Sequence, residues 1–210
     1  VVVKPSEFTP STSSLIKEII ESIFKTNEIS VIEGDYTVGS YLVGLKFDHI
    51  FFTGSPEIGS LVMQSAAKNL ASVTLELGGK NHTIVDETAN IKDAAEKILW
   101  SKYVNCGQTC IAVNHVFVHS KSYNLFISSI EEVLKKFFSK KSDYGHIVNK
   151  KHHNRLKAIL KECLSHSGSV LIESDDKGLD GHFPLTIVKD LDMSNPILKN
   201  EIFGPILPII

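Results

Sequence analysis

Cysteine, tryptophan and methionine are scarce in this sequence of 210 residues, which contains three, one and two of them, respectively. Three cysteines are too few, and odd in number, for the disulfide framework that staples a small secreted domain. They favour a reducing compartment, and they make each thiol a candidate for chemistry.

An excess of either charge is also absent. Lysine and arginine together number 22 and aspartate and glutamate 24, which gives a formal net charge of −2. A nucleic-acid-binding domain usually carries a basic surface and a pI above about 9, so we expect no nucleic-acid partner. An apolar share of 42% and a charged share of 22% argue against a disordered chain.

The sequence shows no membrane or export signal. No stretch reaches the ~18 consecutive apolar residues of a membrane-spanning helix, and no secretory signal pattern is present. We therefore expect a cytoplasmic protein with no membrane segment in this chain.

Both ends are apolar, at residues 1–3 and 206–210, whereas mature termini are usually polar and poorly ordered. These ends predict a piece of a longer protein, truncated on both sides.

Strand and helix patterns alternate along the chain, which predicts an α/β fold with a largely parallel sheet. The polar stretches 139–143 and 174–181 are expected to be exposed loops. Strands are expected at residues 1–3, 29–32, 48–53, 73–76, 83–85, 113–118, 169–172 and 183–188. Helices are expected at residues 10–24, 36–45, 56–70, 91–103, 123–138 and 152–165.

Cys110 is the first candidate for chemistry, because it lies between a predicted helix and a predicted strand in the sequence GQTCIA. A thiol on such a loop can be exposed, and nearby backbone N–H groups can favour the nucleophilic thiolate or hold an oxyanion. The alternative is a small buried hydrophobic residue. Cys163, on a predicted amphipathic helix, is expected to be a core or surface residue with no chemical role.

Two histidines follow the first two cysteines at a distance that permits a metal site. Cys106 and Cys110, with His115 and His119 on the next predicted strand, provide the ligand types of a Cys2His2 zinc centre. The spacing is not that of a known zinc motif, so we expect no bound metal.

A glycine-containing turn follows the predicted strand at residues 48–53. Gly54, Ser55 and Gly59 lie where this strand gives way to a helix, and the N–H groups at a helix N-terminus attract phosphate. The segment is neither a P-loop nor the dinucleotide-binding fingerprint. A plain strand-to-helix turn therefore remains an alternative to a phosphate site.

Several charged residues lie at strand ends. Glu76 could act as a general base if burial brought its pKa toward the working pH, and Glu201 is equally open to a role. Lys4 and Glu7 follow the first strand, where α/β folds place ligands. Each of these residues could also be an ordinary exposed charge.

The order of these segments resembles the aldehyde dehydrogenase superfamily, over the whole chain from Val1 to Ile210. The surrounding sequence is most similar to the class 3 and fatty aldehyde dehydrogenase branch. The motifs that carry the resemblance are Lys4-Pro5-Ser6-Glu7, Phe52-Thr53-Gly54-Ser55 with Gly59, Glu76-Leu77-Gly78-Gly79-Lys80, Gly107-Gln108-Thr109-Cys110 and Glu201-Ile202-Phe203-Gly204-Pro205.

The resemblance implies NAD(P)+-dependent oxidation of an aldehyde, medium- or long-chain aliphatic or aromatic, to a carboxylic acid. Cys110 matches the nucleophile that forms a thiohemiacetal and then a thioester. Glu76 matches the base that activates water to hydrolyse the thioester. A thiolate suits both steps, because it forms and releases an acyl group readily.

The resemblance also assigns cofactor contacts. It places Lys4 and Glu7 at the adenosine ribose, and it places Gly54, Ser55 and Gly59 near the pyrophosphate. Leu77 and Gly78 would lie beside the nicotinamide, Glu201 would hold the nicotinamide ribose, and Phe203 would pack near the ring. Glu33, at the end of the second strand, could accept from the ribose 2′-OH, so we expect NAD+, with NADP+ possible.

The family fold implies two domains. Residues 1–77 would form part of a Rossmann-like NAD(P)-binding domain, and residues 78–210 a catalytic domain that is incomplete at its C-terminus. The longer relatives are expected to be homodimers, some of them anchored to membranes by a C-terminal tail.

The sequence departs from the family pattern in several places. Asn81-His82 stands where Ser-Pro is frequent, and Cys106 stands where serine is common. The second thiol suggests a reversible disulfide between Cys106 and Cys110, which counting free thiols after peroxide would test. An asparagine that donates to the oxyanion lies upstream of the Lys4 motif in relatives and is absent here; losing one such donor typically costs about 10²–10³ in rate.

These departures leave two alternatives to a complete dehydrogenase. The chain could be a non-catalytic piece of such an enzyme, which the missing donor favours and the presence of both Cys110 and Glu76 disfavours. It could also be a thiol hydrolase that pairs Cys110 with His115 or His119, although this leaves the cofactor motifs unexplained.

Overall fold

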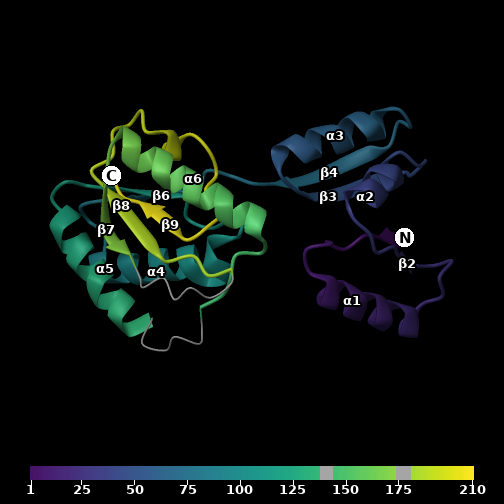
Figure 1. Cartoon of the computed structure of the whole chain (residues 1–210), viewed down its shortest axis with the longest axis horizontal. Helices are drawn as coiled ribbons and strands as arrows, with labels where there is room; N and C mark the ends of the chain where they lie inside the picture. Colours follow the sequence, from purple (N-terminus) through teal and green to yellow (C-terminus); the bar gives the residue numbers. More distant parts are fainter. Residues whose placement is uncertain (138–143, 174–180) are drawn as a thin grey trace. The chain divides into compact units, whose positions relative to one another are not determined.

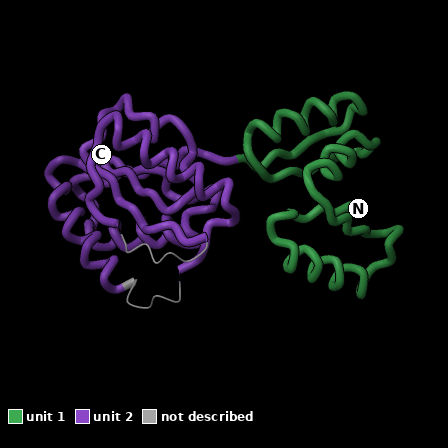
Figure 2. Tube along the Cα trace, in the orientation of Figure 1, with its two compact units in different colours: residues 1–77 green, residues 78–210 purple. Residues whose placement is uncertain are grey.

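A computed structural model describes residues 1–137, 144–173 and 181–210. The chain divides into two compact units, Val1–Leu77 and Gly78–Ile210 (Figure 2). Of the two predicted exposed loops, residues 139–143 and 174–180 lie outside the described residues. None of the helices in the described ranges is long and apolar enough to cross a membrane.

The first unit alternates short strands and helices, as the sequence pattern predicts (Figure 1). Strand β1 pairs in parallel with β2, and β3 pairs in parallel with β4. Its elements are β1 (Val2–Val3), α1 (Pro10–Ile23), β2 (Ser30–Val31), α2 (Tyr36–Val43), β3 (His49–Gly54), α3 (Pro56–Ala67) and β4 (Ser72–Leu77).

Local signals set the helix starts of this unit. Pro10 and Pro56 occupy first-turn positions of α1 and α3, where a missing N–H costs nothing. The Asp35 side chain accepts from the backbone N–H of Thr37 at the start of α2, at 2.9 Å. Because β3 and β4 run in parallel, their C-terminal residues Gly54 and Leu77 are register partners, and both strands end at one edge.

The second unit contains one continuous row of strands. Its order is β5, β6, β9, β8, β7, with β6 joined to β9 by the bridge between Val116 and Ile209. Its elements are β5 (His82–Val85), α4 (Ile91–Tyr103), the 3-10 turn η1 (Val104–Gly107), β6 (His115–Val118), α5 (Tyr123–Phe137), α6 (Lys150–His166), β7 (Ser169–Glu173), β8 (Thr186–Lys189), η3 (Pro196–Leu198) and β9 (Ile206–Pro208).

This arrangement confirms the predicted α/β class with largely parallel strands. The β7–β8 pair is antiparallel and is the exception. The strand predicted at residues 183–188 is shorter at its start, because Pro184 has no N–H to donate to a ladder.

Two hydrophobic clusters cover the two faces of this row of strands. Ile187 of β8 and Leu207 of β9 pack in a cluster with α4 and α5, whereas their chain neighbours Val188 and Ile206 pack in a cluster with α6 (Figure 1). Successive side chains of a strand point to opposite faces, so helices on both sides bury this sheet.

Candidate active site

The turn before the candidate nucleophile is left-handed over three consecutive residues. Asn105, Cys106 and Gly107 have φ angles of 53°, 54° and 70°, a region that residues other than glycine adopt rarely. A side chain at Gly107 would meet the backbone carbonyls of Gly204 and Lys102. The turn therefore brings the end of α4 into direct backbone contact with the segment before β9.

Gly107→Ala is expected to lower the free energy of unfolding by about 2–4 kcal/mol, because a positive φ is strained for alanine and the new methyl group meets backbone atoms. Gly145→Ala is the matched control in the same unit, because its added carbon meets only the Cys106 sulfur, at 3.3 Å. Urea unfolding of both variants measures the difference. Equal losses would contradict the close approach at Gly107.

The side chain of Gln108 fixes the loop that follows this turn. Its Nε2 donates to the carbonyl oxygens of Asn105 and His146, both at 3.0 Å, and its Oε1 accepts from the backbone N–H of Val148 at 2.9 Å. Gln108 thus uses both of its amide donors and its acceptor to join the loop to residues 146–148.

The three thiols differ in exposure. Cys110 is exposed, whereas Cys106 and Cys163 are buried. Burial raises the pKa of the Cys106 thiol to about 11, against hydrogen bonds from Tyr144 and Gly145 that lower it. Cys110 is therefore the thiol that can meet a substrate, and Cys163 packs in the core as expected. The disulfide between Cys106 and Cys110 stays a hypothesis, one that requires Cys106 to leave its apolar surroundings.

The histidines have partners of their own. His115 is 6% exposed, and its ring stacks on that of His82 with centroids 5.7 Å apart. The Nδ1 of His119 accepts from the backbone N–H of Lys121 at 3.3 Å. Within the described residues, no three His, Cys, Asp or Glu side chains group together to hold a metal ion. The geometry thus gives no support to the zinc centre, and the engaged rings disfavour the hydrolase alternative.

Glu201 lies against the first residues of the Gly78–Ile210 unit. Its Oε1 accepts from the N–H of Gly79 at 3.2 Å, and a side chain at Gly78 would collide with its carboxylate. Burial raises the pKa of Glu201, opposed by the Gly79 N–H and by the charges of Arg155 and Lys102. The structure thus brings the predicted residues Gly78 and Glu201 together.

Two cations near Glu201 are absent from the sequence-based list of candidate residues. Lys102 is 1% exposed, and burial lowers its pKa to about 7, with Glu201 opposing that shift. Burial also lowers the pKa of Arg155, whose guanidinium donates to the carbonyl oxygen of Phe203 at 3.1 Å. Lys102 could have been found from the sequence, because it lies four residues after Ile98 on the apolar stripe of α4.

The buried amine of Lys102 predicts a specific pH dependence of stability. Between pH 7 and the ordinary lysine pKa of 10.5, the unfolded chain binds a proton that the native state has lost, so the free energy of unfolding rises with pH. Lys102→Met removes this contribution. We expect the variant to be more stable than the parent by about 2–4 kcal/mol at pH 7, with the difference shrinking toward pH 10. Urea unfolding at pH 7, 8 and 9 measures it, and parallel pH curves would contradict the burial of the amine.

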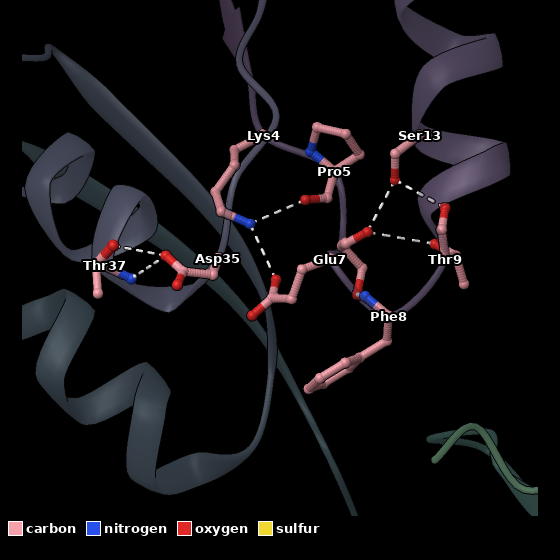
Figure 3. Close-up of polar contacts among 9 residues, drawn as sticks. Lys4, Pro5, Glu7, Phe8, Thr9, Ser13, Asp35 and Thr37 are labelled. Atoms are coloured by element: carbon pink, nitrogen blue, oxygen red, sulfur yellow. Dashed lines mark hydrogen bonds and ion pairs between the residues drawn. The ribbon is translucent and has the colours of Figure 1, made fainter.

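In the first unit, Lys4 and Glu7 form an ion pair just beyond β1. The Lys4 Nζ lies 3.1 Å from the Glu7 Oε2 and donates to the carbonyl oxygen of Pro5 at 2.9 Å (Figure 3). The pKa of Glu7 is lowered by its own backbone N–H and, to a smaller extent, by Lys4. The hydroxyl of Ser13 on α1 donates to the Ser6 carbonyl at 2.8 Å, which holds this turn on the helix.

The predicted phosphate turn lies at the start of α3. The Ser55 hydroxyl accepts from the N–H of Ile58 at 3.4 Å and caps the helix. A side chain at Gly59 would lie 2.7 Å from a methyl group of Leu77, so the glycine lets α3 approach the end of β4 closely. Gly54, Ser55, Gly59 and Leu77 therefore lie around the ends of one parallel strand pair.

Glu76 lies on β4, opposite Thr53 of β3, and its side chain is exposed. The sequence-based expectation of a general base required a buried carboxylate, and this exposure gives that condition no support. Glu76 belongs to the Val1–Leu77 unit and Cys110 to the Gly78–Ile210 unit, so their partnership stays a prediction.

A class of protein follows from these features: an α/β protein with an exposed thiol on a loop fixed by side-chain hydrogen bonds, and with a Ser55-capped helix start after a parallel strand. Residues 1–210 match the family described as the aldehyde dehydrogenase family. The chain belongs to this family.

Known relatives agree with this assignment and include the predicted branch. The chain is 40% identical over 213 residues to 4,4'-diaponeurosporen-aldehyde dehydrogenase of Staphylococcus aureus, covering 100% of this chain and 46% of the relative. It is 34% identical over 213 residues to mouse aldehyde dehydrogenase family 3 member A2, covering 100% of this chain and 43% of the relative. The chain thus spans about half the length of the curated relatives it matches.

A solved structure supports the fold. A betaine aldehyde dehydrogenase variant from Staphylococcus aureus, in complex with NAD+, is 28% identical with a TM-score of 0.90, covering 100% of this chain and 44% of that one.

Proposed function

We propose that this chain takes part in the NAD(P)+-dependent oxidation of an aldehyde to a carboxylic acid, with Cys110 as the nucleophile. The observation that carries the proposal is the exposure of Cys110 beyond a rigid turn, while the other two thiols are buried. Family membership supplies the reaction class, and the substrates favoured are medium- or long-chain aliphatic or aromatic aldehydes.

In the proposed reaction, the Cys110 thiolate adds to the aldehyde carbon and forms a thiohemiacetal. NAD(P)+, held by the residues described in the next paragraph, would supply the oxidising power as the hydride acceptor. The resulting thioester remains on the Cys110 sulfur. Glu76 takes a proton from water, the hydroxide oxygen adds to the thioester carbon, and the thiolate leaves as the acid forms.

The residues present fit a dinucleotide. The capped N-terminus of α3 after Ser55 offers backbone N–H groups for a pyrophosphate. Gly59 lets this helix pack closely against the end of β4. Lys4 and Glu7 would hold the adenosine ribose. Glu201, fixed by the Gly79 N–H, would hold the nicotinamide ribose, beside Leu77, Gly78 and Phe203.

Glu33 supports NAD+ over NADP+ in this proposal, because a carboxylate accepts from a ribose 2′-OH and repels a 2′-phosphate. The Lys17 Nζ lies 3.7 Å from the Glu33 Oε2 and would weaken that repulsion.

We also propose a homodimeric full-length enzyme, which sedimentation measurements would test.

The test mixes the purified protein with NAD+ or NADP+ and an aliphatic or aromatic aldehyde. We expect one equivalent of carboxylic acid for each NADH formed, faster reaction with NAD+, and none after iodoacetamide has alkylated Cys110. Ester hydrolysis without cofactor would instead favour the thiol hydrolase. A folded protein that forms no NADH, while Cys110 still reacts with iodoacetamide, would favour the non-catalytic alternative.

A further inference from the structure

Two asparagines join the segments that carry Cys110 and Glu201. Asn81 directly precedes β5. Its side-chain Nδ2 donates to the carbonyl oxygens of Cys110, at 2.6 Å, and Ala112, at 3.2 Å. Both amide hydrogens are therefore used on the nucleophile loop, on either side of Ile111.

Asn114 directly precedes β6 and repeats this pattern on the other segment. Its backbone N–H donates to the carbonyl oxygen of Asn81 at 2.8 Å. Its side chain is 2% exposed; the Nδ2 donates to the Asn200 carbonyl at 3.2 Å, and the Oδ1 accepts from the Ile202 N–H at 2.8 Å. These two bonds flank Glu201 and fix the backbone on both sides of it.

The last contact closes a ring. The Glu201 Oε1 accepts from the N–H of Gly79 at 3.2 Å, two residues before Asn81. Hydrogen bonds thus run from residues 79–81 to residues 110–114, on to residues 200–202, and back to residue 79. Displacing any one of the three segments changes the bonds that hold the other two.

We propose that Asn81 and Asn114 are positioning residues that hold the Cys110 loop and Glu201 in one fixed arrangement. The inference rests on the proposed function, in which Cys110 attacks the aldehyde and Glu201 orients the nicotinamide ribose. Neither asparagine needs to touch the reacting atoms. Their effect comes from geometry, since a displacement of about 1 Å at the reacting groups can cost about 10²-fold in rate.

The kinetic test uses Asn81→Ala, Asn114→Asp and the double variant. Asn114→Asp keeps the acceptor for Ile202 and removes the donor to Asn200. We expect each single variant to lower kcat by about 30- to 100-fold, with KM for the aldehyde within about 3-fold of the parent. The double variant should fall at most about 3-fold below the worse single variant, because the two residues act as one unit.

Asn195→Asp is the matched control. The Asn195 side chain is fully buried, donates to the carbonyl oxygens of Cys163 and Ser167 at 3.0 and 2.9 Å, and accepts from the Ile197 N–H at 3.1 Å. Like Asn114, it is a buried asparagine that donates to backbone carbonyls and accepts from a backbone N–H, and it lies outside the ring. Asn195→Asp should lower the thermal stability of the protein and leave kcat within about 3-fold of the parent value. A matching fall in kcat for the control would overturn the proposal.

Backbone hydrogen exchange supplies a readout that needs no turnover. Asn81→Ala should speed exchange around Ile202, which the Asn81 side chain does not contact. Asn114→Asp should speed exchange at Gly79, whose N–H donates to Glu201 and which the Asn114 side chain does not contact. If the exchange rate rises only at the residues whose hydrogen bond was removed, the three segments do not hold one another, and the proposal is overturned whatever the kinetic result. If the parent protein forms no NADH but the two variants show the exchange changes at both distant sites, the proposed function is overturned and the ring remains supported.

Discussion

Replacing Cys110 with serine is expected to lower the rate of NADH formation by at least about 10³-fold. The hydroxyl of serine is a far weaker acid than a thiol, so almost none of it is ionised at neutral pH, and no base on the described loop is placed to activate it. The thiohemiacetal then does not form, and both later steps lack their substrate. Initial rates with saturating aldehyde and NAD+ measure the effect.

Two comparisons make this prediction specific. Cys163→Ala removes a thiol of the same kind from the buried face of α6, so it should lose stability and keep its rate. Iodoacetamide should label the parent and Cys163→Ala at one rapidly reacting thiol each, and Cys110→Ser at none. If Cys110→Ser kept more than a tenth of the parent rate, Cys110 would not be the nucleophile.

Glu76→Gln should separate the two halves of the reaction. Glu76 is proposed to act only on water, after hydride transfer, so the amide variant should still form about one NADH per Cys110. Steady-state turnover should then fall by about 10²–10³-fold, within the range that a general base contributes. Rapid mixing measures this initial burst of about one NADH per Cys110. Mass spectrometry of the Cys110 peptide should find the acyl group trapped on the sulfur.

Glu131→Gln is the control for this change, since Glu131 is an exposed carboxylate on α5. It should show neither a burst nor a loss of turnover. Loss of the burst together with turnover in Glu76→Gln would mean that Glu76 acts before hydride transfer. An unchanged steady-state rate would mean that another group activates the water.

Helix positions followed from short-range signals. The helix expected at residues 91–103 is α4, Ile91–Tyr103, where Asn90 caps the first turn by accepting from the Asp93 N–H at 3.3 Å. Its apolar residues recur at helical spacing, so a short stretch of sequence is enough to predict the helix. Strand limits were less accurate, because each strand ends where its neighbour stops pairing.

The candidate residues divide in the same way. Cys110 and Glu201 stand in motifs that a linear reading can find. Asn81, Asn114 and Arg155 carry no such signal, because the backbone groups that their side chains bind lie 29 or more residues away along the chain. Their parts in the ring and around Glu201 exist only once three distant segments have packed together.

The two neighbouring thiols show where the division falls. Residue type and local pattern settled that Cys106 and Cys110 lie between a helix and a strand, four positions apart. Only packing made one thiol a core residue with a pKa of about 11 and left the other exposed. Cys106 lies within a left-handed turn held against Gly204, nearly a hundred residues away, and Cys110 lies beyond that turn. No property of the thiols themselves distinguishes the buried one from the exposed one.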